Sequence, residues 1–121
     1  MMNQENQSKT YFEVIAPAQW TLPVVLNSPH SGDHVPAELL QQSALSEIEL
    51  RRSEDRFVDE LFSGCVEHGA PMLKAKVSRA FVDLNREPYE LDPDMFKGQL
   101  PSHANTSSPR VIAGLGTIPK I

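Results

Sequence analysis

Residues 22–32 read LPVVLNSPHSG, and this segment indicates the fold class more clearly than any other part of the chain. Its first half, residues 22–26, is short, apolar and β-branched, which is typical of a buried β-strand. Its second half is a polar turn, so that His30 follows the carboxyl end of the predicted strand. Because ligands of open α/β sheets bind beyond the carboxyl ends of the strands, His30 is a candidate functional residue.

Strand and helix patterns alternate around this segment. Alternating side chains predict further short strands at residues 11–15, which we expect to be an edge strand, and at residues 72–77 and 79–84. Strands that alternate with helical segments predict an α/β fold with a mixed sheet and flanking helices.

The helical segments lie between residues 37 and 69. Residues 37–42 are expected to form one helical turn, and Ser46-x-x-Glu49 has the form of a capping box. Apolar residues then recur at spacings of three and four, which predicts a longer helix that begins at a Ser53 cap and ends at a left-handed Gly69.

Two segments have a loop composition. Residues 1–10 are polar and are predicted to be a disordered lead-in. Residues 85–108 are rich in Pro, Asp, Asn, Ser and Gly, which predicts a long loop. The folded domain is therefore expected within residues 11–121.

Composition excludes several classes of function. Sixteen acidic residues against eleven basic ones give a net charge of −5, and no basic run exceeds Arg51-Arg52, which disfavours nucleic acid as a partner. No apolar stretch approaches the ~20 residues that span a bilayer. Cys65 is the only cysteine, so it has no partner for an internal disulfide, and the first residues lack the apolar core of a secretory signal. We therefore expect a cytoplasmic protein that contacts no membrane.

A nitrogen and an oxygen ligand are joined in one loop by His30-x-x-Asp33. Such a pair suits Zn²⁺, which binds both atom types at about 2 Å. A third ligand must come from elsewhere, and Asp55 is a candidate because the predicted helix turns it toward the core, with Glu54 a similar case. The competing interpretations are a hydrogen-bonded loop histidine and two acids that stabilise a helix N-terminus by about 0.3–1 kcal/mol.

A second group of polar residues consists of Arg79 and the pair Asn85-Arg86. Guanidinium groups match carboxylates with two parallel hydrogen bonds, so arginines near a metal would suit an acidic substrate or a developing oxyanion. The competing interpretation is that these arginines form ordinary salt bridges with neighbouring acids, of which Asp83, Glu87 and Glu90 are the nearest.

Three motifs occur in order along the chain: NSPHSG at residues 27–32, SEDRFVDEL at 53–61 and SRAFVDLNREP at 78–88. With these motifs the sequence resembles the N-formylglutamate amidohydrolase family, and AGLGTI at residues 113–118 is similar to a later segment of that family. The resemblance runs from about residue 24 to the end of the chain. The Asp-Leu-Asn-Arg string also resembles that of aspartoacylase and succinylglutamate desuccinylase.

This resemblance implies a zinc-dependent-exopeptidase-like (phosphorylase/hydrolase-like) α/β fold, of which residues 11–121 form the N-terminal portion. It implies a zinc cofactor and the hydrolysis of N-formyl-L-glutamate to glutamate and formate, in histidine degradation. For the metal site it implies His30 as a ligand together with a carboxylate. We favour Asp55 for that carboxylate, with Asp33 second.

The resemblance also implies roles for the second group. Arg79 would stabilise the oxyanion, while Asn85 and Arg86 would hold the carboxylate of a small N-acyl amino acid. Enzymes of the family continue well beyond the AGLGTI segment, and their later half supplies a further histidine ligand and the general base. We therefore expect a truncated chain that is inactive alone and that self-associates through exposed core surface.

Two alternatives stay open. In the first, the chain is a non-catalytic module that binds a small carboxylate through Arg79 and Arg86. In the second, it is a family member that acts on a different N-acyl amino acid.

Overall fold

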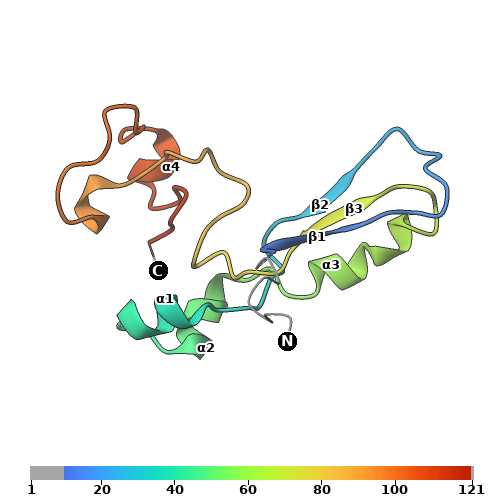
Figure 1. Ribbon diagram of the computed structural model, residues 1–121, viewed down its shortest axis with the longest axis horizontal. Helices are drawn as coiled ribbons and strands as arrows, with labels where there is room; N and C mark the ends of the chain where they lie inside the picture. Colours follow the sequence, from blue (N-terminus) through green and yellow to red (C-terminus); the bar gives the residue numbers. More distant parts are fainter. Residues whose placement is uncertain (1–9, 121) are drawn as a thin grey trace, which may run out of the picture.

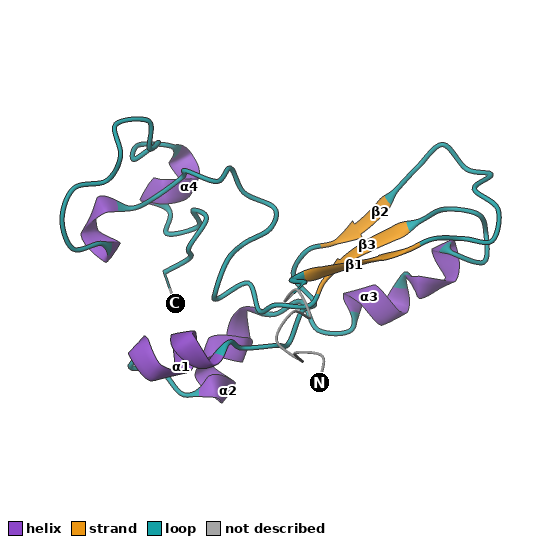
Figure 2. Cartoon of the chain, viewed as in Figure 1, coloured by secondary structure: helices purple, strands orange, loops and turns teal. Residues whose placement is uncertain are grey.

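The computed structural model describes residues 10–120 of the chain. The predicted lead-in over residues 1–10 therefore lies outside the described residues, apart from Thr10. Figure 1 shows a small sheet with the α3 region beside it, while the regions of α1, α2 and α4 extend to one side. Loops make up much of the rest (Figure 2), in line with the chain's ten prolines. Between residues 10 and 120, no helix is both long and apolar enough to cross a membrane.

The helical elements are all short. The α-helices are α1 at Ala37–Gln42, α2 at Glu47–Leu50, α3 at Val58–Leu61 and α4 at Pro109–Ile112. Tighter 3₁₀ turns lie at Arg51–Ser53, Ser63–Cys65 and Pro93–Met95. The predicted turn at residues 37–42 is thus confirmed.

A three-stranded mixed sheet forms the centre of the fold. Its strands are β1 at Phe12–Ile15, β2 at Leu26–Ser28 and β3 at Met72–Ala75, in the order β1-β3-β2. The central strand β3 pairs antiparallel with β1 and parallel with β2. This confirms the predicted α/β class, the mixed sheet and the edge strand near residue 11. The ladder is shorter than the predicted strand over residues 72–77, because only an isolated bridge from Val77 to His34 continues it.

The prediction of a buried strand over residues 22–26 is wrong in position. The strand begins only at Leu26, and Leu22, Val24 and Val25 are exposed. Pro23 has no amide hydrogen for a ladder. In addition, Leu26 is already paired with the first residue of β3, so that the preceding residues have no strand beside them.

The prediction of one continuous helix from Ser53 to Gly69 is also wrong. Ser53 makes no cap, and the backbone enters the left-handed region at Phe57, where φ is 66°. Only α3 and a 3₁₀ turn follow, and the apolar side chains of Phe57, Leu61 and Phe62 are exposed. Helices gain most of their stability from packing of the apolar face, and these three side chains are left largely unpacked. The left-handed end at Gly69 is confirmed, with φ of 91°.

No strand forms over residues 79–84. The amide of Phe81 donates to Ser78 O, which closes a turn, and the amide of Asp83 donates to Thr117 O rather than to a strand. The buried residues of this segment are Ala80 and Asp83, which are three positions apart and so do not follow the alternation of a strand. The following segment is the predicted long loop, interrupted by the 3₁₀ turn at Pro93–Met95 and a bridge between Glu90 and Asn105.

The capping box at the start of α2 is confirmed. Ser46 Oγ accepts from the Glu49 amide, and Glu49 Oε2 lies 2.8 Å from the Ser46 amide nitrogen. The hydrogen bond from the Ser46 amide, and to a smaller extent the one from the Ser46 hydroxyl, hold the pKa of the Glu49 carboxyl below its usual range. At the end of α2, Leu50 packs with Val35 and Ala80 in a small core.

Replacing Ser46 with alanine is expected to lower the free energy of unfolding by about 1 kcal/mol, because the cap hydrogen bond is lost. Urea unfolding followed by circular dichroism measures this change. Ser102→Ala, at an exposed turn, serves as the control and should leave the midpoint unchanged. Equal midpoints for the two variants would contradict a stabilising role for the cap.

Candidate active site

The His30 loop is held against the segment before α3. The amide of Asp55 donates to His30 O at 3.0 Å, and Ser31 Oγ donates to Asp55 O at 2.9 Å. Ser28 and Ser31 hydroxyls lie 2.7 Å apart and close the turn at the end of β2. The prediction that His30 follows a strand end is confirmed, and backbone contacts rather than a helix face bring Asp55 to it.

The imidazole of His30 lies between two carboxylates. Its Nδ1 is 3.3 Å from Asp55 Oδ2, and its Nε2 is 2.8 Å from Asp83 Oδ1. The His30 side chain is 12% exposed, while Asp55 is 56% exposed and Asp83 only 1% exposed. The ring therefore has one nitrogen toward the interior and one toward an accessible carboxylate.

Asp83 connects the predicted site residues to one another. Its Oδ1 also accepts the amide of Asn85 at 2.9 Å, and its Oδ2 accepts from Arg79 Nη2 at 2.9 Å. A second guanidinium, that of Arg86, has Nη2 at 3.8 Å from Oδ2. Burial acts to raise the pKa of Asp83, but the hydrogen bond from His30, the Asn85 amide, and the charges of His30 and Arg79 outweigh it and hold that pKa below its usual range.

The two arginines are anchored differently. Arg86 donates from Nε to Leu115 O at 2.8 Å and from Nη1 to Asn85 O at 2.9 Å, so it also ties the AGLGTI segment to the site. Arg79 Nε is buried and has no hydrogen-bond partner within the described residues. Five donors on each guanidinium exceed the bonds that these arginines make, which leaves N–H groups for an anionic ligand.

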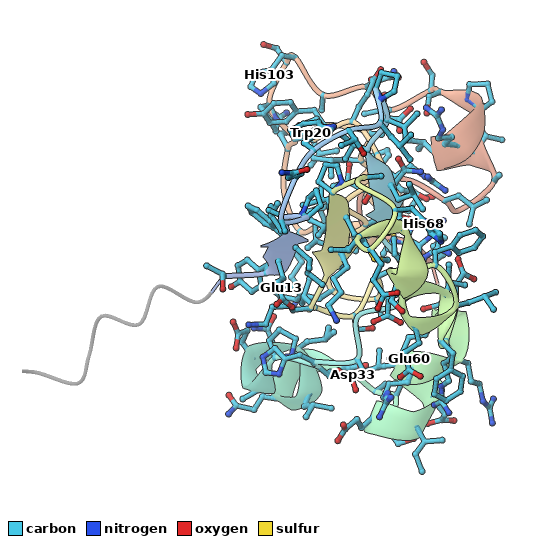
Figure 3. The ribbon with its side chains drawn as sticks, turned by 90° about the vertical axis from the view of Figure 1, so that its right-hand side faces the viewer. Glu13, Trp20, Asp33, Glu60, His68 and His103 are labelled. Atoms are coloured by element: carbon cyan, nitrogen blue, oxygen red, sulfur yellow. The ribbon has the colours of Figure 1, made fainter. Side chains whose placement is uncertain are left out.

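The ion pairs of Asp33 and Glu54 are with arginines. Asp33 is 73% exposed, with its nearest cation, Arg51, at 3.8 Å. The Glu54 side chain is 1% exposed and is held by Arg51 at 2.9 Å and Arg56 at 3.4 Å. Figure 3 shows Asp33 on the same side of the molecule as Glu60, and both line a cavity of about 410 Å³ that does not include His30.

Asp83 is the site residue that sequence reasoning missed, since it was considered only as a salt-bridge partner of Arg79 or Arg86. One signal was present: the acid stands four residues after one arginine and three before the other. Within residues 10–120, no group of three or more His, Cys, Asp or Glu side chains has the geometry to hold a metal ion. His30 and Asp55 are thus two candidate ligands that no third such side chain joins among these residues.

Comparisons with known proteins agree with the motifs. The sequence matches the family model of N-formylglutamate amidohydrolase over residues 22–121. The chain is similar to the crystal structure of N-formylglutamate amidohydrolase from Ralstonia eutropha JMP134, solved at 2.00 Å, with 30% identity and a TM-score of 0.79. This similarity covers 89% of the present chain and 38% of the Ralstonia chain, so the present chain spans well under half of that protein. No curated protein matches the sequence.

Proposed function

Because the chain belongs to the N-formylglutamate amidohydrolase family, we propose that it contributes part of an active site that hydrolyses the amide bond of N-formyl-L-glutamate. The products would be glutamate and formate, and the reaction would serve histidine degradation. The observation that carries this proposal is the set of contacts around His30 and Asp83, since they bring His30 and Asp55 together with two arginines at one place.

Support for zinc comes from the distance between two ligand atoms. In a tetrahedral site with bonds of about 2.0–2.1 Å, neighbouring ligand atoms lie about 3.3 Å apart. His30 Nδ1 and Asp55 Oδ2 are separated by 3.3 Å, and without metal they are within hydrogen-bond distance of each other. The 2.8 Å between His30 Nε2 and Asp83 Oδ1 also suits a hydrogen bond. His30 and Asp55 would therefore hold the ion, with Asp33 as the second choice for the carboxylate.

The chain's own residues would then bind and orient the substrate. When bound, Zn²⁺ supplies Lewis-acid activation of a water and of the formyl carbonyl. Arg79 would donate to the oxyanion that develops on the formyl oxygen, where a fixed donor is most effective. Asn85 and Arg86 would hold a substrate carboxylate, since a guanidinium matches it with two donors. We assign the general base and the remaining metal ligand to the part of the family fold outside residues 22–121.

Metal binding and hydrolysis test the proposal separately. Zn²⁺ added to the chain is expected to bind with one-to-one stoichiometry. His30→Gln and Asp55→Asn should each abolish this binding, because a single protein ligand remains. His68→Gln, at an exposed position, serves as the matched control and should bind as the wild type does. Binding that survives in His30→Gln would overturn the assignment of the ligand.

Formate release from N-formylglutamate tests the activity. The chain alone is expected to be inactive, whereas a hybrid in which residues 22–121 replace the matched region of the Ralstonia protein should release formate. N-acetylglutamate, as the second substrate, distinguishes a formyl-specific enzyme from one that accepts other N-acyl groups. A folded hybrid that binds glutamate without hydrolysis, insensitive to chelator, would favour the non-catalytic carboxylate-binding module.

A further inference from the structure

The hydroxyl of Ser31 meets three different segments of the chain. It lies 2.7 Å from the hydroxyl of Ser28 at the end of β2, donates to Asp55 O at 2.9 Å, and accepts from the Asp59 amide at 3.3 Å. A serine hydroxyl has one hydrogen and two lone pairs. Because a carbonyl oxygen only accepts, the hydrogen of Ser31 goes to Asp55 O, and Ser28 must then donate to Ser31. All three bonding positions of the Ser31 hydroxyl are therefore used.

Asp55 is held by two consecutive residues of the His30 loop. Its amide donates to His30 O at 3.0 Å, and its carbonyl oxygen accepts from Ser31 Oγ. The carboxylate of Asp55 is 56% exposed, and within residues 10–120 its one hydrogen bond is the 3.3 Å contact with His30 Nδ1. The two backbone contacts therefore keep Asp55 beside His30, and loss of the Ser31 hydroxyl would remove one of them.

A strained residue lies two positions after Asp55. Phe57 has φ of 66°, and within residues 10–120 it is the one residue other than glycine with a positive φ. Left-handed backbone is costly for a side chain of this size and persists only where surrounding contacts impose it. The Phe57 side chain is 66% exposed, so its own packing supplies little of that constraint. Ser31 supplies it instead, because its hydroxyl binds Asp55 before Phe57 and Asp59 after it.

The bond to Asp59 also caps α3. Amides in the first turn of a helix have no partner within the helix, and the side chain of the residue before the helix commonly accepts from one of them. The residue before α3 is Phe57, which makes no such hydrogen bond. Ser31, which precedes Asp59 by 28 positions, accepts from that amide in its place.

We propose that Ser31 is a positioning residue whose hydroxyl holds the left-handed turn at Phe57 and thereby keeps the Asp55 carboxylate beside His30. This inference rests on the proposed function, because Asp55 is the carboxylate that the proposed function assigns to the metal. The contacts that carry it are nevertheless present in the chain without metal. Ser31→Ala removes the donor to Asp55 and the acceptor for Asp59 together, whereas Ser28→Ala removes neither.

The first test is amide hydrogen exchange of the wild-type chain without metal, followed by NMR. The Asp59 amide lies in the first turn of a helix, yet we expect it to exchange more slowly than in an unstructured peptide, because Ser31 accepts from it. The Asp55 amide should be protected as well, through its bond to His30 O. An unprotected Asp59 amide in the folded wild type would overturn the proposal without recourse to any variant.

The second test compares two alanine variants, with the amides of β3 as the reference for overall stability. In Ser31→Ala, exchange at Asp55 and Asp59 should become about 10-fold faster, because hydrogen bonds that hold both residues are lost. Ser28→Ala, at a buried residue of the same turn, is the matched control and should change exchange at these two amides by less than about 2-fold. Equal acceleration in both variants, or none in Ser31→Ala, would contradict the proposal.

Zn²⁺ binding separates the inference from the proposed function. The dissociation constant of Ser31→Ala for Zn²⁺ should rise about 10- to 100-fold, while Ser28→Ala should bind as the wild type does. A wild-type chain with the expected exchange pattern that binds no Zn²⁺ would overturn the metal site of the proposed function and support the role of Ser31. A folded Ser31→Ala variant that keeps the wild-type affinity would overturn the inference and leave the proposed metal site standing.

Discussion

Asp83→Ala is expected to lower the free energy of unfolding by about 3–5 kcal/mol, because it removes one partner from a buried ion pair. The side chain is 1% exposed and accepts from His30, the Asn85 amide and Arg79. Alanine would leave the Arg79 guanidinium, itself largely buried, without its anion. For a domain whose total stability is about 5–15 kcal/mol, such a loss is severe.

Urea unfolding measures this loss, and Asp33→Ala provides the matched control. Asp33 is an exposed aspartate whose arginine partner is 3.8 Å away, so its removal should change the free energy of unfolding by less than about 0.5 kcal/mol. Similar midpoints for the two variants would show that the buried network around Asp83 contributes little to stability.

The stabilisation by Asp83 should also depend on pH. Its pKa is lower in the folded chain than the ordinary value of 3.8. Because folding lowers this pKa, the ionised carboxylate stabilises the fold at pH values above its ordinary pKa. This contribution is lost as the pH falls through the pKa that the group has in the folded chain. The difference in stability between the wild type and Asp83→Ala should therefore shrink as the pH falls below 3.8.

Gly32→Ala is expected to destabilise the chain by about 3 kcal/mol, at the upper end of the overpacking range. A Cβ atom at Gly32 would overlap the carbonyl oxygen of Val77 and lie 2.7 Å from the carbonyl carbon of Lys76. These are backbone atoms next to β3, which cannot move aside as a flexible side chain can. Relief of the overlap would displace the loop that carries His30, so the binding of Zn²⁺ at His30 should also be lost.

Gly64→Ala is the matched control for this substitution. A Cβ atom at Gly64 would meet no atom within 4 Å. Because alanine restricts the unfolded chain more than glycine does, this variant should be unchanged or more stable by about 0.4–1 kcal/mol. Thermal unfolding of the two variants under one condition makes the comparison. A melting temperature of Gly32→Ala at or above that of Gly64→Ala would contradict the packing argument.

The sequence predicts local features well when a few neighbouring residues determine them. The capping box at Ser46 and Glu49 and the left-handed Gly69 are of this kind, since each depends on bonds or backbone angles within one turn. The placement of His30 after a strand is similarly local. The edge strand near residue 11 follows from its alternating side chains.

Features that depend on a distant partner were predicted poorly. The apolar spacing around Phe57 and Leu61 suggested a long helix, but an amphipathic stripe stabilises a helix only when another layer covers it. The segment at residues 22–26 suggested a buried strand, yet the ladder starts where β3 starts. Asp83 was passed over because its contact with His30 joins residues 53 positions apart, which no local pattern contains.

The order of the strands has a consequence for biosynthesis. Both outer strands of the sheet, β1 and β2, precede their common partner β3 along the chain. At a synthesis rate of about 5–20 residues per second, they wait several seconds at the ribosome before residues 72–75 emerge to pair with them. During that interval the backbone groups that later pair with β3 are open to other chains. The sheet therefore cannot form until β3 has been made.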